Sequence, residues 1–556
     1  MKTIIKTLTT LSILIAFVNP IKASHMLGGE ITYECLNNGQ YVFYMDIYFD
    51  CSGIAFGFNN EQITISTPSG QLPKNSNGAT ISSIIVKPDS SRWMGLNNGD
   101  ISPSCSAGGT AISCPDLGAW QVYTYKSDPI TFTGVPTGTS LDLAYNMVCC
   151  RGNYDNISAN GSSRVRLKTQ IFSSSIGSNY TCEFSSARFA EVPTYFGYTN
   201  QDASLSSAAF NFDADSLIYS FDSHTTNESG FVFNSNFGFN QLTPGTQSHA
   251  QNKPIQIDRH SGQMDFKVMA NSGEYVLFVK VNSYRGGQLL NTVYREMPIH
   301  LYSPAVNQNL AEIPNIPEPF TTGNGIQTFY DTVLVGSLVS INSRITDTNT
   351  VNGNPQTISL RIMGENIAAD YSYNGNCVNP NDSNCAFLQL VSPVLDSRTN
   401  SYQVQASSFI NSRLKWQTDC SDLSSTNGPK THYFVYRAQD DLCPIPGVNY
   451  KTIAVTVIPD VNNPCQLATA IEEQDRFEQL KLYPNPTADN FKILLPNPES
   501  FRLTIKDIQG KTIHTQNVNH QSQLEVNLEG PAGIYFVELL NENGLSTFRK
   551  LIKYNF

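Results

Sequence analysis

The sequence contains few charged residues and no concentrated positive charge. Asp, Glu, Lys and Arg make up 15% of its 556 residues, and the formal net charge at pH 7 is -11. No tract of lysine and arginine stands out. Because binding to phosphate groups needs a positive field, this charge argues against nucleic acid or an anionic membrane as a partner. It is compatible with divalent cations without requiring them.

The common catalytic motifs are missing as well. The eight histidines include no His-Glu-x-x-His spacing, and there is no Gly-x-Ser-x-Gly elbow, phosphate loop or dinucleotide fingerprint. Tight Cys-x-x-Cys pairs, which are typical of zinc–thiolate sites, are also absent. We therefore expect a protein that is not an enzyme. Glycosidase carboxylates are paired in space and not in sequence, so a secreted carbohydrate-active or proteolytic hydrolase, with its site in the N-terminal domain, is the alternative.

Long apolar runs are scarce, and the one that stands out lies at the N-terminus. Two lysines precede an apolar stretch over residues 8–18, and Ala23 provides a small residue for cleavage. This pattern predicts a secretory signal peptide over residues 1–23, too short for a membrane span. No other segment approaches the length of a transmembrane helix. We expect a soluble chain that leaves the cytoplasm and matures near Ser24.

Cysteine, in contrast, is plentiful. Twelve cysteines in an exported chain predict disulfides before reactive thiols. Seven lie between residues 35 and 182 and five between 377 and 465, so either one thiol stays unpaired in each half or one bridge joins the halves. Spacing does not determine connectivity. The candidate pairs are Cys105–Cys114, Cys377–Cys385 and Cys420–Cys443.

Alternating polar and apolar residues recur along nearly the whole chain, with almost no amphipathic helix. The turn Asn37-Asn38-Gly39 precedes one clear example, residues 40–49, which places every second residue from Tyr41 on one face. Trp416 near Cys420, followed by an aromatic strand, is typical of an immunoglobulin-like sandwich. The predicted fold class is all-β, with several immunoglobulin-like β-sandwich modules in tandem and a small C-terminal β-sandwich.

Six segments are expected along the chain. The signal peptide is followed by an N-terminal β domain over 24–192, an immunoglobulin- or cadherin-like sandwich over 193–303, and a second immunoglobulin-like sandwich over 304–459. A polar, acidic stretch over 460–479 is predicted to be an exposed, cleavable linker. The last segment covers residues 480–556.

This last segment carries several motifs in a fixed order. Short alternating strands are expected at 491–495, 502–506, 523–528, 534–539 and 547–552, separated by turns rich in Gly, Pro and Asn. The motifs are Leu482-Tyr483-Pro484-Asn485-Pro486, Ile505-Lys506-Asp507-Ile508-Gln509-Gly510, Ala532-Gly533-Ile534-Tyr535-Phe536 and Arg549-Lys550-Leu551-Ile552. The segment is similar to the type A C-terminal sorting domain of the type IX secretion system of Bacteroidetes. An ordinary C-terminal β-sandwich is the alternative.

The resemblance implies that the secretion machinery is a partner and that the chain reaches the outer cell surface, where the domain is removed. The residues that match the family's pattern, and that the resemblance assigns to the sorting signal, are Tyr483, Pro484, Asn485, Pro486, Asp507, Gly510, Gly533, Tyr535 and Lys550.

Two short motifs near the N-terminus resemble large secreted Bacteroidetes surface proteins, including gliding-motility-associated ones. These are Ala23-Ser24-His25-Met26-Leu27-Gly28-Gly29-Glu30-Ile31-Thr32-Tyr33 and Cys149-Cys150-Arg151-Gly152-Asn153. The resemblance implies a surface protein that acts in adhesion, matrix building or gliding. Surface glycans or other surface proteins are then the expected ligands. Aromatics on sheet faces are candidates to stack on sugars or partner strands, and ordinary packing is the expectation for most of them. These aromatics are Tyr44, Tyr48, Tyr123 and Tyr125.

Calcium is the one candidate cofactor. Residues 210–219 and 257–262 resemble a strand entry and the following turn of cadherin-like immunoglobulin repeats, and Ca²⁺ prefers several oxygen ligands. The candidate ligands are Asp213, Asp215 and Asp258. Asn211 and Ala214 depart from the family's pattern, which removes a charge and stiffens the turn, so a polar interstrand turn is favoured over calcium. A weaker second cluster comprises Asp347, Asp440 and Asp441.

Overall fold

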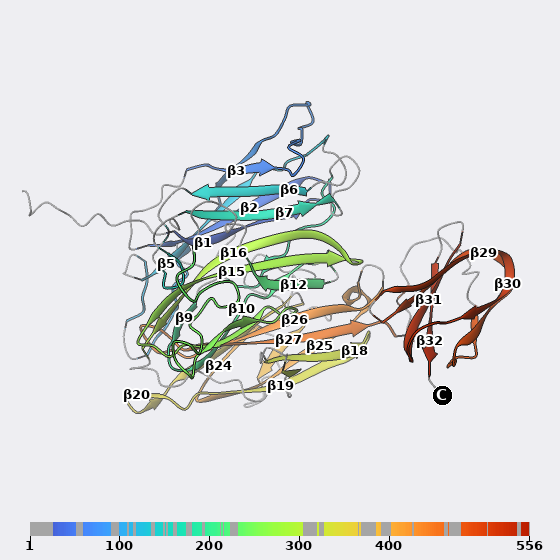
Figure 1. Cartoon of the computed structure of the whole chain (residues 1–556). Coiled ribbons are helices and arrows are strands. Elements are labelled where there is room, and N and C mark those ends of the chain that lie inside the picture. Colours follow the sequence, from blue (N-terminus) through green and yellow to red (C-terminus); the bar gives the residue numbers. More distant parts are fainter. Residues whose placement is uncertain are drawn as a thin grey trace, which may run out of the picture. The chain divides into compact units, whose positions relative to one another are not determined.

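A computed structural model describes residues 26–554 apart from gaps at 52–58, 90–98, 108–109, 115–117, 135–139, 148–150, 152–153, 159–163, 174–180, 192–194, 212, 215, 223–231, 304–319, 322–326, 365, 368–384, 391–401, 425–426, 461–464, 466–479, 509 and 542–545. The predicted signal peptide lies outside the described residues. The chain divides into two compact units, residues 1–466 and 467–556. Both are built almost entirely of strands, which confirms the all-β class (Figure 1). Among the described residues, no helix has the length and apolar character to cross a membrane.

The first unit begins with the hairpin that the sequence predicts. Strands β1 (Met26–Cys35) and β2 (Tyr41–Asp50) pair antiparallel, and Gly39 takes the positive φ of 78° that the turn needs. Tyr41, Phe43 and the following alternate residues of β2 are buried in one core. The period-two pattern therefore grouped the residues of one face, although the other face of β2 is mostly buried as well.

The largest sheet has eleven strands and contains β1 and β2. The strands that follow β2 in its order are β5 (Trp120–Ser127), β4 (Ser83–Pro88), β3 (Glu61–Ser66), β6 (Ser140–Met147), β7 (Val165–Phe172), β16 (Gln288–Tyr302), β15 (Gly273–Arg285) and β12 (Ser216–Phe221). β9 (Tyr195–Tyr198) pairs in parallel with β16. Because β7 pairs with β16, this sheet runs across the boundary expected at 192/193.

Two small sheets complete this half of the unit. One joins β10 (Asp202–Ser206), β14 (Gln263–Lys267) and β13 (Lys253–Ile257), and the other pairs β8 (Arg188–Phe189) with β11 (Ala209–Phe210). The long hairpin of β15 and β16 contributes Val276 to Val279 to the same core as these sheets.

The rest of the unit is a sandwich of two sheets. One contains β17 (Phe320–Thr321), β18 (Gln327–Leu334), β27 (Val448–Ile458), β26 (Lys430–Gln439), β22 (Thr357–Gly364) and β24 (Gln403–Ser407). The other contains β19 (Leu338–Thr346), β25 (Phe409–Gln417) and β23 (Phe387–Leu390), and β20 (Thr350–Val351) pairs with β21 (Asn354–Pro355). Trp416 is fully buried between them, with its ring centroid 5.4 Å from that of Phe434.

The sandwich packs directly against the earlier sheets, so unit 1 is continuous. The hydroxyl of Tyr198 donates to the carbonyl of Ile445 at 2.5 Å, and the Ser204 hydroxyl donates to the carbonyl of Tyr450 at 2.6 Å. Both Ile445 and Tyr450 belong to the core of the N-terminal half. The three modules expected at 24–192, 193–303 and 304–459 therefore share hydrophobic cores and do not form separate domains.

Two of the three predicted disulfide pairs do not form in the structure. The observed bridges are Cys35–Cys182, Cys51–Cys114, Cys105–Cys443 and Cys420–Cys465. The predictions Cys105–Cys114 and Cys420–Cys443 are wrong, because strand packing brings each cysteine to a partner that is distant in sequence. Cys377 lies outside the described residues, although Cys385 is disulfide-bonded. The alternative of one bridge between the two halves occurs, as Cys105–Cys443.

Unit 2 is a small sheet domain of five strands. These are β28 (Lys481–Tyr483), β29 (Asn490–Asp507), β30 (Thr512–Asn527), β31 (Gly533–Asn541) and β32 (Ser546–Lys553). Phe491, Ile493, Leu503 and Ile505 alternate inward along β29. The strands expected at 534–539 and 547–552 are confirmed as β31 and β32. The two strands expected at 491–495 and 502–506 are one continuous strand, β29, and β30 begins eleven residues earlier than the expected 523. β28 was not expected.

Candidate functional sites

The Tyr-Pro-Asn-Pro motif of unit 2 connects the start of the domain to its last strand through hydrogen bonds. Asn485 Nδ2 donates to the carbonyl of Lys550 at 2.7 Å, and the Ile552 N–H donates to Asn485 Oδ1 at 2.9 Å. The amide side chain thus bonds β32 as a neighbouring strand would. Tyr483 is among the most exposed large apolar side chains of the described chain, at 69%. The motif therefore has a structural residue, Asn485, and an outward one, Tyr483.

Two turns are held by other residues of the predicted signal. The Gly510 N–H donates to the Asp507 carbonyl, and the Lys511 N–H donates to Asp507 Oδ1, both at 3.0 Å. Gly510 has φ 79°, so the turn requires its conformational freedom. In the second turn, the buried Tyr535 donates its hydroxyl to the carbonyl of Pro531 at 2.7 Å. Gly533 begins β31 just after this turn.

The outer face of β31 and β32 exposes apolar side chains. Ile534, Phe536 and Leu540 alternate with buried residues of β31 and are exposed. Ile534 pairs with the exposed Ile552 of β32, and Lys550 pairs with Phe536. Adjacent exposed apolar groups of this kind are typical of contact surfaces. This face is the candidate contact surface of unit 2.

Replacing Asn485 with alanine is expected to loosen β32. Two hydrogen bonds are lost, which corresponds to about 1–2 kcal/mol of local stability. In the full chain, hydrogen exchange at the Ile552 amide should accelerate roughly tenfold. Asn527→Ala is the matched control, because it removes a side-chain hydrogen bond of the same kind, from Asn527 Nδ2 to Asn490 Oδ1 at 2.9 Å, that involves no residue of β32. Unchanged protection of Ile552 in Asn485→Ala would contradict this role.

The two N-terminal motifs meet at buried ion pairs. Arg295 Nη2 donates to Glu30 Oε1 at 2.9 Å, and Arg295 also contacts Glu30 through Nε. Arg151 Nη1 lies 2.8 Å from Glu296 Oε1. Burial raises the pKa of Glu296 to about 7, and Arg151 opposes that rise. Sequence reasoning missed these pairs, and the local signal was the dipeptide Arg295-Glu296 within a strand that is mostly buried.

Glycines allow this close contact. A Cβ at Gly28 would overlap the carbonyl oxygen of Glu296, and one at Gly29 would overlap that of Asp46. β1 and β16 pair here through Gly29–Glu296 and Glu30–Arg295. The two glycines of the Gly-Gly-Glu motif therefore allow β1 to pack closely against β16, and its glutamate forms an ion pair with β16.

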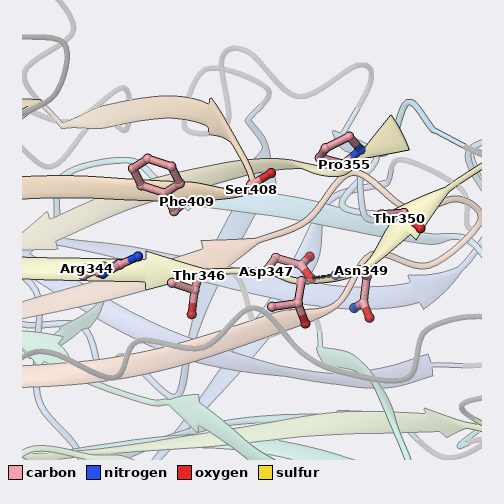
Figure 2. A pocket seen from close by; sticks show the side chains of 9 residues that line it. Arg344, Thr346, Asp347, Asn349, Thr350, Pro355, Ser408 and Phe409 are labelled. Atoms are coloured by element: carbon pink, nitrogen blue, oxygen red, sulfur yellow. Dashed lines mark hydrogen bonds between the residues drawn. The ribbon is translucent and has the colours of Figure 1, made fainter. Parts of the chain in front are cut away.

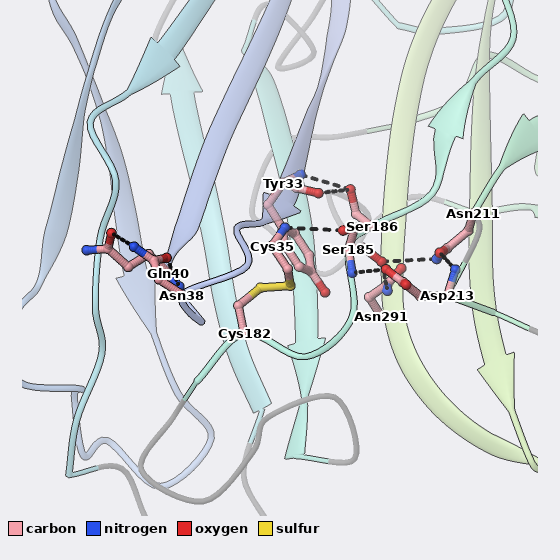
Figure 3. Close-up of a disulfide and its surroundings, with 10 residues drawn as sticks. All are labelled: Tyr33, Cys35, Asn38, Gln40, Cys182, Ser185, Ser186, Asn211, Asp213 and Asn291. Carbon is pink, nitrogen blue, oxygen red and sulfur yellow. Dashed lines mark hydrogen bonds between the residues drawn. A yellow bond between two sulfur atoms is a disulfide. The ribbon is translucent and has the colours of Figure 1, made fainter. Parts of the chain in front are cut away.

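The candidate calcium residues Asp213 and Asp258 hold turns and neighbouring segments. Asp213 Oδ2 accepts the Ser185 N–H at 2.8 Å, close to the Cys35–Cys182 disulfide (Figure 3). Asp258 Oδ1 accepts from the Ser261 N–H at 2.8 Å and from the Tyr330 hydroxyl at 2.9 Å. Asp215 lies outside the described residues. Such bonds fit the favoured alternative of a polar turn, while calcium at these three residues stays a prediction.

The aromatics expected to stack on sugars lie mostly in the core. Tyr48, Tyr123 and Tyr125 are buried, so for them the expected alternative of ordinary packing holds and stacking on sugars does not. The alternation of β2 and β5 carried no information on which face meets another sheet, and here both faces are covered. Tyr44 is half-buried, with Arg188 over its ring at 5.1 Å.

A pocket of about 360 Å³ opens beside the end of β19. Figure 2 shows Asp347 and Asn349 along one side, with Ser408 and Phe409 on the facing segment, where β25 begins. Asp440, a member of the same predicted cluster, accepts the N–H groups of Leu442 and Gly447 and so holds a turn. The pocket therefore contains Asp347 but is not lined by Asp440.

The strongest candidate for acid–base chemistry is His300. Its Nδ1 lies 3.5 Å from Glu274 Oε1, and its ring packs edge-on against Trp120 at 4.8 Å. Burial lowers the pKa of His300 to about 4, although Asp50 opposes this shift. Burial also raises the pKa of Glu274, and Asp155 adds to the rise. A base with so low a pKa is weak near neutral pH.

Comparison with known proteins identifies unit 2. The family model of the secretion system C-terminal sorting domain matches residues 481–554. This part of the chain is therefore a sorting domain. It is the domain of the type IX secretion system that the motifs predicted, so the chain engages that machinery and is secreted to the cell surface.

The remaining comparisons are weaker. None of the curated proteins matches this chain. Similar solved structures include the periplasmic chaperone SfaE, at 13% identity and TM-score 0.15, over 41% of this chain and 97% of that one. A segment of titin has 12% identity and TM-score 0.15 over 66% and 97%, and Drosophila N-cadherin has 11% and 0.15 over 84% and 94%. At these TM-scores the likeness carries no inference about this chain.

Proposed function

We propose that unit 1 is a non-enzymatic binding module displayed on the outer cell surface, where it acts in adhesion, matrix building or gliding. The observation that carries the proposal is the sorting domain at residues 481–554 joined to a large unit of packed sheets. An all-β unit with several disulfide bonds suits a protein that must stay folded outside the cell. Surface glycans or other surface proteins are the proposed ligands.

The burial of His300 supports a binding role over the hydrolase alternative. Its imidazole is packed against Trp120, and its Nε2 is buried and has no hydrogen-bond partner among the residues that the structure describes, so the atom that would handle a proton faces no solvent. The neighbouring Glu274 is half exposed and accessible to water. This pair is the specific place where hydrolysis would be looked for.

The function is tested with the mature chain purified from the cell surface. We expect the chain to bind members of a panel of immobilised glycans and surface proteins. We also expect that it does not degrade polysaccharide or casein, so that the amount of ligand stays constant during the assay. The matched comparison is the variant Glu274→Gln together with His300→Ala. Hydrolysis by the native chain that disappears in this variant would favour the secreted hydrolase instead.

Deleting residues 480–556 is expected to abolish surface display. The truncated chain lacks the domain that the secretion machinery recognises, so it should accumulate in the periplasm while unit 1 keeps its own core. Fractionation and protease shaving of intact cells measure the distribution. The full-length chain at the same expression level is the control, and equal surface amounts of both chains would contradict the sorting role.

A further inference from the structure

The sheet of β19, β25 and β23 has one buried and one outward face. Burial alternates along all three strands, so that residues such as Ile345 and Leu414 enter the core of the sandwich while the residues between them stay at the surface. We call this second set the outer face. It contains every second residue of β19 from Leu338, of β25 from Phe409 and of β23 from Phe387.

The outer face carries positive charge without negative charge. It contains Arg344, Arg413 and Lys415, and none of its residues is Asp or Glu. Among the residues that the structure describes, no carboxylate pairs with these three side chains, and Arg344 instead lies over the ring of Phe409, 5.6 Å from its centroid. Because the whole chain has a net charge of -11, an anionic ligand would be attracted to this face and repelled by most of the remaining surface.

The three cations form a row across the outer face. Arg413 and Lys415 are two residues apart on β25, which separates them by about 7 Å along the strand. Arg344 of β19 is paired with Asn411, so it stands one step further in the same direction. Neighbouring like charges on a sheet repel each other. A linear polymer with repeated negative charges would relieve this repulsion along the whole row.

Uncharged polar side chains lie beside the cations. Arg413 Nε donates to Asn342 Oδ1 at 2.7 Å, which uses one of the five guanidinium donors. Gln389 of β23 is paired with Arg413 on the opposite side, and Asn411 precedes Arg413 on the same face of β25. Amide groups can both donate to and accept from hydroxyls. A ligand that combines carboxylates with many hydroxyls therefore matches the groups of this face.

The row of cations ends at the pocket beside β19. Arg344, Thr346 and Phe409 belong both to the outer face and to the lining of this pocket (Figure 2). The ring of Phe409 is 42% exposed, whereas the carboxylate residue of the lining, Asp347, is only 4% exposed. A volume of about 360 Å³ lies at the lower end of the range for small-ligand pockets. The pocket therefore suits a group of the size of one sugar ring, with an aromatic ring and a guanidinium beside it.

We propose that the outer face and its pocket bind a polysaccharide built from uronic acids, whose carboxylates contact Arg344, Arg413 and Lys415. This inference rests on the proposed function of unit 1 as a binding module, and it names the class of ligand. A guanidinium forms two parallel hydrogen bonds with a carboxylate, so two arginines in the row favour this anion.

Two other anionic partners fit the outer face less well. An acidic protein surface would be expected to meet large apolar groups at the centre of its contact, but here the centre consists of cations and amides. Duplex DNA is bound through many phosphate contacts, and three cations would give only weak binding.

The test measures binding of the mature chain, purified from the cell surface, to immobilised polygalacturonate and alginate, with dextran as the neutral polymer. We expect both uronate polymers to bind and dextran not to bind. Binding should weaken roughly tenfold between about 50 and 200 mM NaCl, because salt competes with about three ionic contacts.

The variant Arg413→Gln together with Lys415→Gln is expected to bind polygalacturonate at least about tenfold more weakly. The matched control is Lys87→Gln together with Lys253→Gln, which removes the same charge from two exposed lysines elsewhere in unit 1 that already pair with aspartates. Phe409→Ala leaves the charge unchanged and reports on the pocket. We expect it to weaken binding severalfold, because the ring beside Arg344 is lost.

Weaker binding in the Arg413 and Lys415 variant, with native binding in the lysine control, supports the proposal. Equal binding by these two variants overturns it, as does tighter binding of dextran sulfate or duplex DNA than of either uronate polymer. Native affinity in Phe409→Ala overturns the role of the pocket. Binding of a neutral glycan or a surface protein without binding of the uronate polymers overturns this inference and leaves the proposed function intact, whereas no binding to any ligand counts against both.

Discussion

Replacing Cys105 and Cys443 together by alanine is expected to lower the free energy of unfolding of the mature chain by about 5 kcal/mol. The two cysteines are separated by 338 residues; the chain-entropy relation gives about 6 kcal/mol for such a loop, and the measured effects of disulfides reach about 5 kcal/mol. The bridge also secures a backbone pairing, because the Cys443 N–H donates to the Ala107 carbonyl at 2.8 Å. Loss of the bridge should increase the conformational entropy of the unfolded chain and weaken this backbone pairing in the folded state.

Denaturant unfolding under non-oxidising, non-reducing conditions measures the change. The matched control replaces Cys420 and Cys465, which are separated by 45 residues and should contribute about 4 kcal/mol by the same relation. Hydrogen exchange at Ala107 and Cys443 should rise only in the first variant. A smaller loss for Cys105 and Cys443 than for the control pair would contradict the importance of this long-range bridge.

Replacing Glu30 by alanine is expected to destabilise the mature chain by about 3–5 kcal/mol. The partner Arg295 is 3% exposed, so removing Glu30 would leave a buried charge without its counter-ion. The remaining close contacts, the Glu191 carbonyl at 2.9 Å and the ring of Phe189, are uncharged. Asp46 also favours the charged form of Arg295, but it accepts the hydroxyl of Thr124 and is not one of these close contacts. A neutral ring and a carbonyl therefore cannot replace the carboxylate.

The control for this prediction is Glu34→Ala. Glu34 pairs with Arg188 at 2.8 Å but keeps 42% of its side chain exposed, so its loss should be about 1 kcal/mol or less. A double variant, Glu30→Met with Arg295→Met, should recover most of the lost stability, because apolar groups of similar volume can replace a buried pair. Equal losses in Glu30→Ala and Glu34→Ala, measured by denaturant unfolding, would show that the ion pair is not effectively buried.

Local patterns predicted the sorting domain well. Phe491, Ile493, Leu503 and Ile505 alternate with polar residues, and only one face of this small sheet is buried, so period two marks each strand. Asp507 and Gly510 form a turn through bonds within five residues of each other. Features of this kind depend on neighbours in the sequence and can be read from it.

The calcium candidates show that contacts between residues distant in the sequence could not be predicted from it. Asp258 was expected beside Asp213 as a ligand, but its Oδ1 bonds Tyr330, a residue 72 positions away that the sequence could not place. Asp347 belonged to a weaker candidate cluster, and only the packing of the strands shows that this residue is buried. The same holds for Tyr48 and Tyr125, which lie on strands covered on both faces.

By itself, the sequence determined that the chain is all-β and ends in a sorting domain for secretion to the cell surface. These properties follow from alternation, turn residues and short motifs, all of which act over a few residues. Only the tertiary structure decided the pairing of Cys105 with Cys443, the union of Glu30 with Arg295 and the joining of three expected modules into one unit. Such contacts join residues hundreds of positions apart, and their partners are selected by how sheets pack in space.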